Sequence, residues 1–79
     1  SESADLVVAN IQADVLCANA ELLLCAVRSQ GRLALSGILS IEAKKTSEFF
    51  QETINCLGLS FILRRKDEGE WAQLTLIRR

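Results

Sequence analysis

The 79-residue sequence predicts an α/β fold in which strands and helices follow one another in the order β-α-β-α-β-β. Three observations predict this order. The chain opens with an apolar run that does not alternate, continues with two stretches of apolar residues at helical spacing, and closes with two alternating segments. A run that is apolar on both faces is typical of a parallel sheet, and two alternating segments joined by a short polar loop are typical of a hairpin.

The first strand is predicted at residues 5–9, whose last four side chains are all apolar. This pattern favours an interior strand that is buried on both faces. A helix is predicted next, from about Asp14 to Arg28, because apolar residues recur there at helical spacing. Asp14 is expected to cap the start of this helix, and Gly31 is expected to stop it.

The second strand is predicted at residues 32–37, which read RLALSG. Ser40 is expected to cap a second helix that runs to about Cys56, and Gly58 is expected to end it. The inner stripe of this helix is predicted to contain Ala43, Thr46, Phe50, Ile54 and Leu57.

The last two strands are predicted at residues 59–65 and 71–77, where apolar and polar residues alternate. Residues 66–70, which read KDEGE, are expected to join them as an antiparallel hairpin. Trp71 is interpreted as a packing anchor over the edge of the sheet.

The predicted order indicates that the sheet is incomplete. Strand–helix–strand crossovers are almost always right-handed, so both helices are expected on one face of the sheet. The other face would then expose apolar side chains, in a chain that is 49% hydrophobic. We therefore expect residues 1–79 to be a single partial domain, the C-terminal half of a doubly wound, Rossmann-like sheet whose other half precedes Ser1.

Composition disfavours several partners. Nine Lys plus Arg against ten Asp plus Glu give a net charge of −1, so no general attraction to nucleic acid or to an anionic membrane is expected. The basic residues at 64–66 and 78–79 are interpreted as solvated strand ends that do not form one patch. Without an apolar run of about 18 residues or a leader pattern, the chain is expected to be cytoplasmic.

The three cysteines do not suggest a metal site. Cys17, Cys25 and Cys56 are widely spaced and the chain has no histidine, whereas a zinc site normally needs four Cys or His ligands at close spacings. They are interpreted as small buried apolar residues in a reducing compartment.

The candidate site residues follow the first two strands. In open α/β sheets the carboxyl ends of the strands line the ligand crevice, which places Asn10, Ser36 and Gly37 at that edge. An amide can orient a nucleophile or a cofactor, but Asn10 can also be explained as a cap of the following helix. Ser36 and Gly37 are candidates for the acceptor pocket, and Gly37 has the alternative role of letting the chain turn.

The whole chain resembles the C-terminal half of class I S-adenosylmethionine-dependent methyltransferases, and most closely the ribosomal-protein methyltransferase family called PrmA. Three stretches carry the resemblance: DLVVANIQAD is similar to the family's fourth-strand motif, GRLALSGIL to its fifth strand, and GEWAQLTLIRR to its last strand. Gln12 departs from the pattern, since the family usually has Leu there.

The resemblance implies a protein N-methyltransferase that acts on the lysine and α-amine groups of a large-subunit ribosomal protein. It implies that Asn10 contacts S-adenosylmethionine or the acceptor, with Ser36 and Gly37 on the acceptor side and no catalytic acid or base in this half. The four glycines form no glycine-rich cofactor loop, so these residues alone are expected to be inactive. The alternative is a non-catalytic, truncated α/β module that associates with itself or with a partner through the bare face of its sheet.

Overall fold

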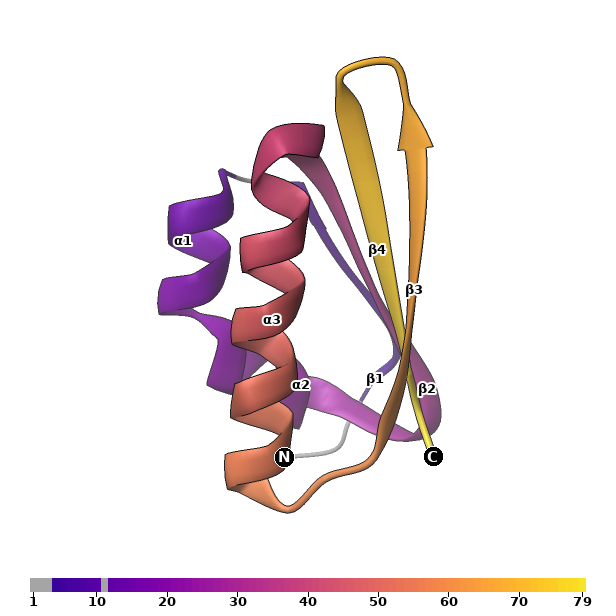
Figure 1. Cartoon of the computed structure of the whole chain (residues 1–79). Helices are drawn as coiled ribbons and strands as arrows, with labels where there is room; N and C mark the ends of the chain where they lie inside the picture. Colours follow the sequence, from indigo (N-terminus) through magenta and orange to yellow (C-terminus); the bar gives the residue numbers. More distant parts are fainter. Residues whose placement is uncertain (1–3, 11) are drawn as a thin grey trace.

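A computed structural model describes residues 4–10 and 12–79. In this part of the chain, a four-stranded sheet carries its helices on one face (Figure 1). In chain order the elements are β1 (Ala4–Asn10), α1 (Ala13–Ala18), α2 (Ala20–Ala26), β2 (Val27–Leu39), α3 (Ser40–Leu57), β3 (Phe61–Glu68) and β4 (Trp71–Arg78).

The sheet has the strand order β1-β2-β4-β3. β1 and β2 are parallel neighbours, and β4 is antiparallel both to β2 and to β3. The predicted α/β architecture, with two parallel strands joined through helices and a C-terminal hairpin, is therefore confirmed.

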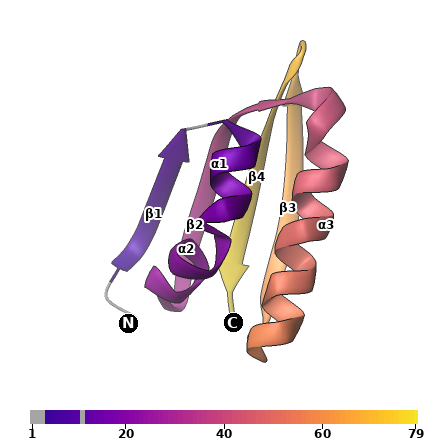
Figure 2. The same cartoon turned by 90° about the vertical axis from the view of Figure 1, so that its left-hand side faces the viewer.

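The core lies between the sheet and the helices. Figure 2 shows α1 and α2 in front of the β1–β2 side of the sheet and α3 in front of the β4–β3 side. The strands contribute Leu33, Leu35, Leu74 and Leu76, none of which is accessible to solvent. The predicted inner stripe of α3 is buried at Ala43, Thr46, Phe50 and Ile54, while Leu57 is only partly buried.

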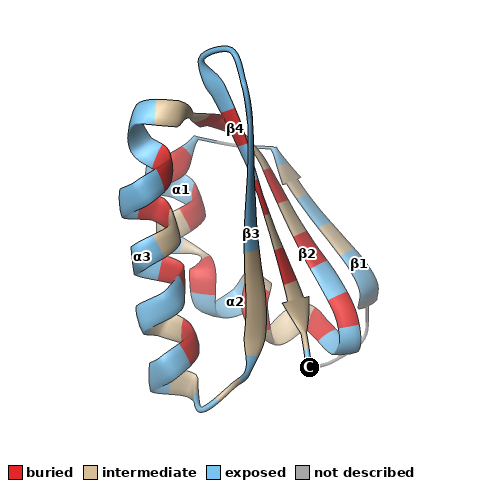
Figure 3. Ribbon diagram, turned by 45° about the vertical axis from the view of Figure 1, so that its right-hand side comes forward, coloured by how far each residue is buried: buried red, intermediate tan, exposed pale blue. Residues whose placement is uncertain are grey.

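The opposite face of the sheet is covered by no helix of the described residues, as the expected crossovers require (Figures 1 and 3). The prediction that the first strand is interior is wrong for this chain, because β1 lies at the edge of the sheet. Leu6 is 59% exposed and Val8 is 65% exposed, whereas Val7 packs against the core. Among the described residues, no helix is both long enough and apolar enough to cross a membrane.

The first predicted helix is divided into two at Asn19. The amide of the Asn19 side chain donates to the carbonyl oxygen of Val15 at 2.8 Å. This side chain competes with the backbone for the helical acceptor, which is a known reason for a break at asparagine. The predicted cap is also wrong: Gln12 precedes α1 as its N-cap, and the Asp14 carboxylate instead accepts from the backbone N–H of Val15 at 2.9 Å.

Gly31 does not stop the helix, because α2 ends at Ala26 and Val27 is already extended. β2 is therefore longer than the predicted residues 32–37, with a register shift between its pairings at Val27 and Arg32. The positive φ of 72° in this irregular stretch belongs to Gln30, and Gly31 is buried within the strand.

The second helix and the hairpin keep their predicted order with different bounds. Leu39 is the N-cap of α3 and no side chain caps it, so the predicted capping role of Ser40 is wrong. Gly58 ends α3 in the left-handed conformation, as predicted. β3 begins two residues later than expected but ends three residues later, so that only Gly69 and Glu70 separate β3 from β4.

Candidate site at the carboxyl ends of β1 and β2

The three predicted site residues lie together. Asn10 is the last residue of β1 and is exposed. It lies opposite Ser36 in the parallel pairing with β2, and Gly37 follows Ser36. Because the carboxyl ends of parallel strands face the same edge of the sheet, one amide and one hydroxyl side chain are brought to one place.

A bulge in β2 shapes this place. β2 advances by three residues from Leu35 to Ile38, while the antiparallel partner β4 advances by two. Gly37, inside the bulge, has a φ of +77°, which an L residue with a side chain rarely adopts. A Cβ atom built on Gly37 would overlap Oδ1 of Asn10. The glycine therefore gives room to the Asn10 side chain as well as letting the chain turn.

The geometry does not support the alternative in which Asn10 caps the following helix. α1 begins at Ala13 behind its N-cap Gln12, and in the side-chain hydrogen bond described in its first turn the Asp14 carboxylate accepts from the backbone N–H of Val15. The amide of Asn10 instead lies beside Gly37 at the strand ends, where it is accessible to solvent.

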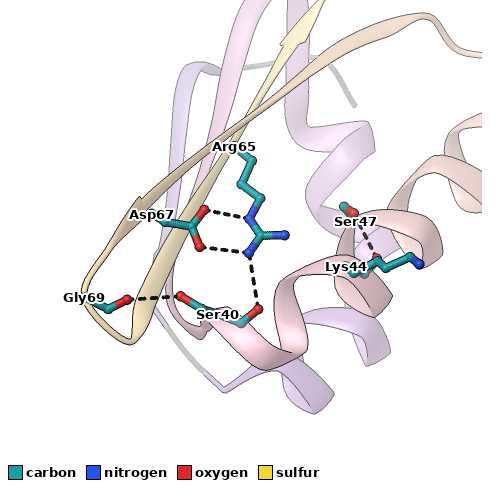
Figure 4. Close-up of polar contacts among 6 residues, drawn as sticks. All are labelled: Ser40, Lys44, Ser47, Arg65, Asp67 and Gly69. Atoms are coloured by element: carbon teal, nitrogen blue, oxygen red, sulfur yellow. Dashed lines mark hydrogen bonds and ion pairs between the residues drawn. The ribbon is translucent and has the colours of Figure 1, made fainter.

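The hairpin is fastened to the start of α3 next to this site (Figure 4). The backbone N–H of Ser40 donates to the carbonyl oxygen of Glu70 at 2.8 Å, and the Ser40 hydroxyl donates to Gly69 O at 3.5 Å. Arg65 forms a two-point pair with Asp67, at 2.7 Å from Nε and 2.8 Å from Nη2, and also donates to Ser40 O at 3.3 Å. We call Ser40, Arg65, Asp67, Gly69 and Glu70 the hairpin clamp.

The clamp changes the acidity of its charged groups. The hydrogen bonds from Arg65 lower the pKa of the Asp67 carboxyl, and the Ser40 hydroxyl contributes in the same direction. The hydrogen bond to Asp67 raises the pKa of Arg65. Both groups are exposed, so this pair fixes the geometry of the hairpin more than it stabilises the fold.

Two grooves flank the Asn10–Gly37 contact, and Gly37 and Trp71 line both. The larger groove, of about 470 Å³, lies on the helix side and is lined by Gln12, Ala13, Asp14, Gly37, Leu39, Glu42 and Trp71. The smaller groove, of about 140 Å³, is lined by Ser36, Gly37, Lys66, Glu68, Trp71, Ala72 and Gln73. We call them the helix-side groove and the hairpin groove.

Trp71 is the site residue that the sequence interpretation missed. The sequence interpretation gave it only a packing role over the edge of the sheet; in the structure 50% of its surface is exposed and it borders both grooves. The signal in the sequence is its position: it opens the last strand directly after a tight turn, where the strand end meets the crevice.

The cysteines correct another prediction. Cys17 and Cys25 are partly buried, but Cys56 is exposed, so the three do not share a buried environment. Burial, and secondarily the nearby charge of Asp14, raises the pKa of the Cys17 thiol, which keeps that thiol protonated. Within residues 4–10 and 12–79, no three His, Cys, Asp or Glu side chains are grouped to hold a metal ion.

Arg64, Arg65 and Lys66 are exposed, as predicted for solvated residues, whereas Arg78 is partly buried. Arg64, Arg65 and Lys66 line a groove together with Arg32, which the sequence interpretation did not associate with them. Arg78 pairs across the hairpin with Phe61 and is not a solvated end, because its Nη1 donates to Val27 O at 2.7 Å.

Comparison with known proteins supplies the family. The model of the ribosomal protein L11 methyltransferase family (PrmA) matches residues 1–79. The chain belongs to this family. The resemblance of the three quoted stretches to PrmA is thereby confirmed.

Relatives agree with this assignment. A ribosomal protein L11 methyltransferase of Marinomonas sp. (strain MWYL1) is 49% identical over 71 residues, which are 90% of this chain and 22% of that protein. One of Hamiltonella defensa is 37% identical over 75 residues, covering 95% of this chain and 23% of that protein. The chain thus spans about a fifth of the length of these relatives.

A solved structure has the same fold. The ribosomal protein L11 methylase of Lactobacillus delbrueckii subsp. bulgaricus superposes with a TM-score of 0.77 and is 28% identical. The superposition covers 95% of this chain and 36% of that chain. The fold of nearly all of these residues is therefore that of part of an L11 methylase.

Proposed function

We propose that these 79 residues are the C-terminal part of the catalytic domain of a cytoplasmic, S-adenosylmethionine-dependent methyltransferase that modifies amino groups of ribosomal protein L11, at lysine side chains and the α-amine. The observation that carries the proposal is the Asn10–Gly37 contact at the carboxyl ends of β1 and β2, in a chain matched by the PrmA family over its full length. The relatives named L11 methyltransferases support the substrate.

The described residues fit one end of S-adenosylmethionine and not the whole cofactor. The exposed amide of Asn10 offers donors and an acceptor, which suits the polar amino-acid end of the cofactor. The positive-φ glycines of the described residues stand singly at 37, 58 and 69, so they form no glycine-rich loop that could approach the cofactor closely. The isolated residues are therefore expected to bind the cofactor with millimolar affinity or weaker, as calorimetry can measure.

When bound, S-adenosylmethionine supplies a methyl group on a positively charged sulfur. Transfer to an amine depends mainly on aligning the nucleophile with that methyl group, so the task of Asn10 is to hold and orient rather than to exchange protons. The absence of a side chain at Gly37 leaves room for the Asn10 side chain, and Ser36, opposite Asn10 on β2, is proposed to line the acceptor pocket together with Gly37.

Asn10→Ala in the full-length protein tests this role. We expect the rate of L11 methylation to fall roughly tenfold to a hundredfold, while the free energy of unfolding changes by less than about 1 kcal/mol, because Asn10 is exposed and does not cap α1. Initial rates with purified L11 and denaturant unfolding give the two quantities.

Asn55→Ala is the matched control, since Asn55 is an exposed asparagine of α3 whose side chain accepts only from Gln51 among the described contacts. An Asn10→Ala protein that keeps its full rate and loses stability would show a structural role instead. A wild-type protein that fails to methylate L11 would refute the function itself.

A second candidate function is a non-catalytic module that associates through the open face of its sheet. The exposure of Leu6 and Val8 favours it, because two large apolar side chains exposed on an edge strand form a surface that a partner chain can cover. A full-length protein that has no methyltransferase activity and associates stably with itself would favour this candidate.

A further inference from the structure

The helix-side groove is large enough for a side chain of a protein substrate. Its volume of about 470 Å³ lies within the range of sites that enclose small ligands. It shares Gly37 with the Asn10 contact, so an occupant of the groove lies next to the proposed site of methyl transfer.

The charge of this groove is negative. Asp14 and Glu42 are the charged side chains among its described lining residues, and both are exposed. Lys45 borders a neighbouring groove between α1 and α3 together with the same two carboxylates, and it offsets one of the two charges. The hairpin groove, by contrast, contains Lys66 beside Glu68. A cation is therefore favoured on the helix side.

Trp71 adds an aromatic surface to the same groove. Its backbone lies opposite Leu39 of β2 and Glu68 of β3, and the adjacent residue Glu70 is held by the hairpin clamp. The half-exposed indole is thus carried on a fixed backbone. Indole is the side chain that attracts a cation most strongly through its ring face.

We propose that the helix-side groove, with Trp71 and Glu42 as its specificity-determining residues, binds the ammonium group of a lysine that flanks the acceptor amine in the protein substrate. This inference rests on the proposed function. Carboxylates and an indole favour the charged form of an amine, whereas the amine that attacks the methyl group must be neutral. The groove therefore suits a flanking lysine better than the reacting amine itself.

Kinetics of the full-length protein test the proposal through Trp71→Leu and Glu42→Gln. We expect KM for L11 to rise about three- to tenfold in Trp71→Leu and about two- to fivefold in Glu42→Gln, with kcat and KM for S-adenosylmethionine unchanged. Trp71→Phe retains a ring face and should restore part of the affinity.

Glu52→Gln is the matched control, because it removes the same charge from an exposed position of α3 outside the groove. Variants whose KM equals that of Glu52→Gln would overturn the proposal while leaving the proposed function intact. A change in kcat and its pH profile at constant KM would also overturn it, by showing that the reacting amine occupies the groove.

A binding measurement is independent of methyl transfer. The probes are two blocked tripeptides, acetyl-Gly-Lys-Gly-amide and its norleucine counterpart, which has a similar length and no charge. In the full-length protein, the indole N–H signal of Trp71, assigned with Trp71→Phe, should shift saturably with the lysine probe and not with norleucine. Equal shifts with both probes, or none with either, would refute the proposal even if L11 were not the substrate.

Discussion

The two faces of the sheet differ in how far their apolar side chains are buried, most clearly between the interior strands and the edge strand β1. On the helix side Leu33, Leu35, Leu74 and Leu76 are wholly inaccessible to solvent. On the open side Leu6 and Val8 are more than half exposed, although they are as apolar as their neighbours. The comparison teaches that an apolar pattern defines which side chains can be covered, whereas the helices that are present decide which ones are.

The largest expected effect on stability comes from truncating a buried side chain on the helix-covered face of the sheet. Leu74→Ala should lower the free energy of unfolding by about 2–5 kcal/mol, because a fully buried leucine leaves a cavity. Thr75→Ala, at the next residue and on the open face, should cost about 1 kcal/mol or less. Denaturant unfolding compares the two, and equal costs would show that both faces are buried in the folded protein.

A substitution at Gly37 tests the bulge of β2 at the carboxyl edge of the sheet. Gly37→Ala introduces strain at φ +77° and an overlap with Asn10, while Gly58→Ala introduces strain at φ +70° with no atom within 4 Å of its new Cβ. We expect the Gly58 variant to lose about 1–2 kcal/mol of unfolding free energy, and the Gly37 variant to lose about 1–2 kcal/mol more.

The same substitutions separate the site from the fold. Gly37→Ala should also slow methyl transfer by the full-length protein, whereas Gly58→Ala should not. In an Asn10→Ala background the effect of Gly37→Ala on rate should largely vanish, because the overlapping amide is gone. Additive effects on rate would show that the two residues act independently.

A charged substitution on the open face tests whether this face mediates self-association. Val8→Lys should weaken self-association of the 79-residue chain about tenfold or more, since the apolar patch contributes roughly 25 cal/mol for each Å² it buries. Leu22→Lys changes an equally apolar residue on α2, 73% exposed and on the helix side, and should have little effect. Sedimentation over a concentration series measures the association, and a monomeric parent chain would refute the expectation.

The smallest effect is expected from the hairpin clamp. The pKa of Asp67 is lowered in the folded chain by Arg65, so the pair stabilises the hairpin at neutral pH and this contribution is lost as the pH falls through that lowered pKa. Asp67→Asn should abolish this pH dependence in the amide signals of Ser40 and Gly69. Asp5→Asn, which breaks the exposed Asp5–Arg28 pair, should leave it in place.

Periodicity predicted most of the fold because it reports which side chains can face a core. The parallel neighbours, the closing hairpin and the end of α3 at Gly58 all follow from local patterns. Local patterns did not predict the places where a side chain forms a hydrogen bond other than the one that its position in the pattern suggests. The bond from Asn19 to Val15 divides a helix that its apolar stripe predicts to be continuous, and Ser40 bonds to the hairpin instead of capping α3.

The candidate site was predicted in part. The strand ends alone place Asn10, Ser36 and Gly37 together, because neighbouring parallel strands finish at the same edge. The position of Trp71 after a tight turn is a signal in the sequence, but the grooves that it lines also depend on the pairing of β4 with β2 beyond the bulge and on the bonds that hold the hairpin to α3. The basic groove was missed for a similar reason: Arg32 and Arg64 are 32 positions apart and meet only through the pairing of β2, β4 and β3.

The strand order has a consequence for how this sheet is built on the ribosome. β4 is the last of the four strands to be synthesised, yet it lies between β2 and β3 and provides Leu74 and Leu76 to the core. Until β4 leaves the exit tunnel, β2 and β3 have no strand to connect them, and the apolar face of α3 lacks much of its support. Completion of this four-stranded sheet therefore waits for β4 and depends on the long-range pairing of β4 with β2.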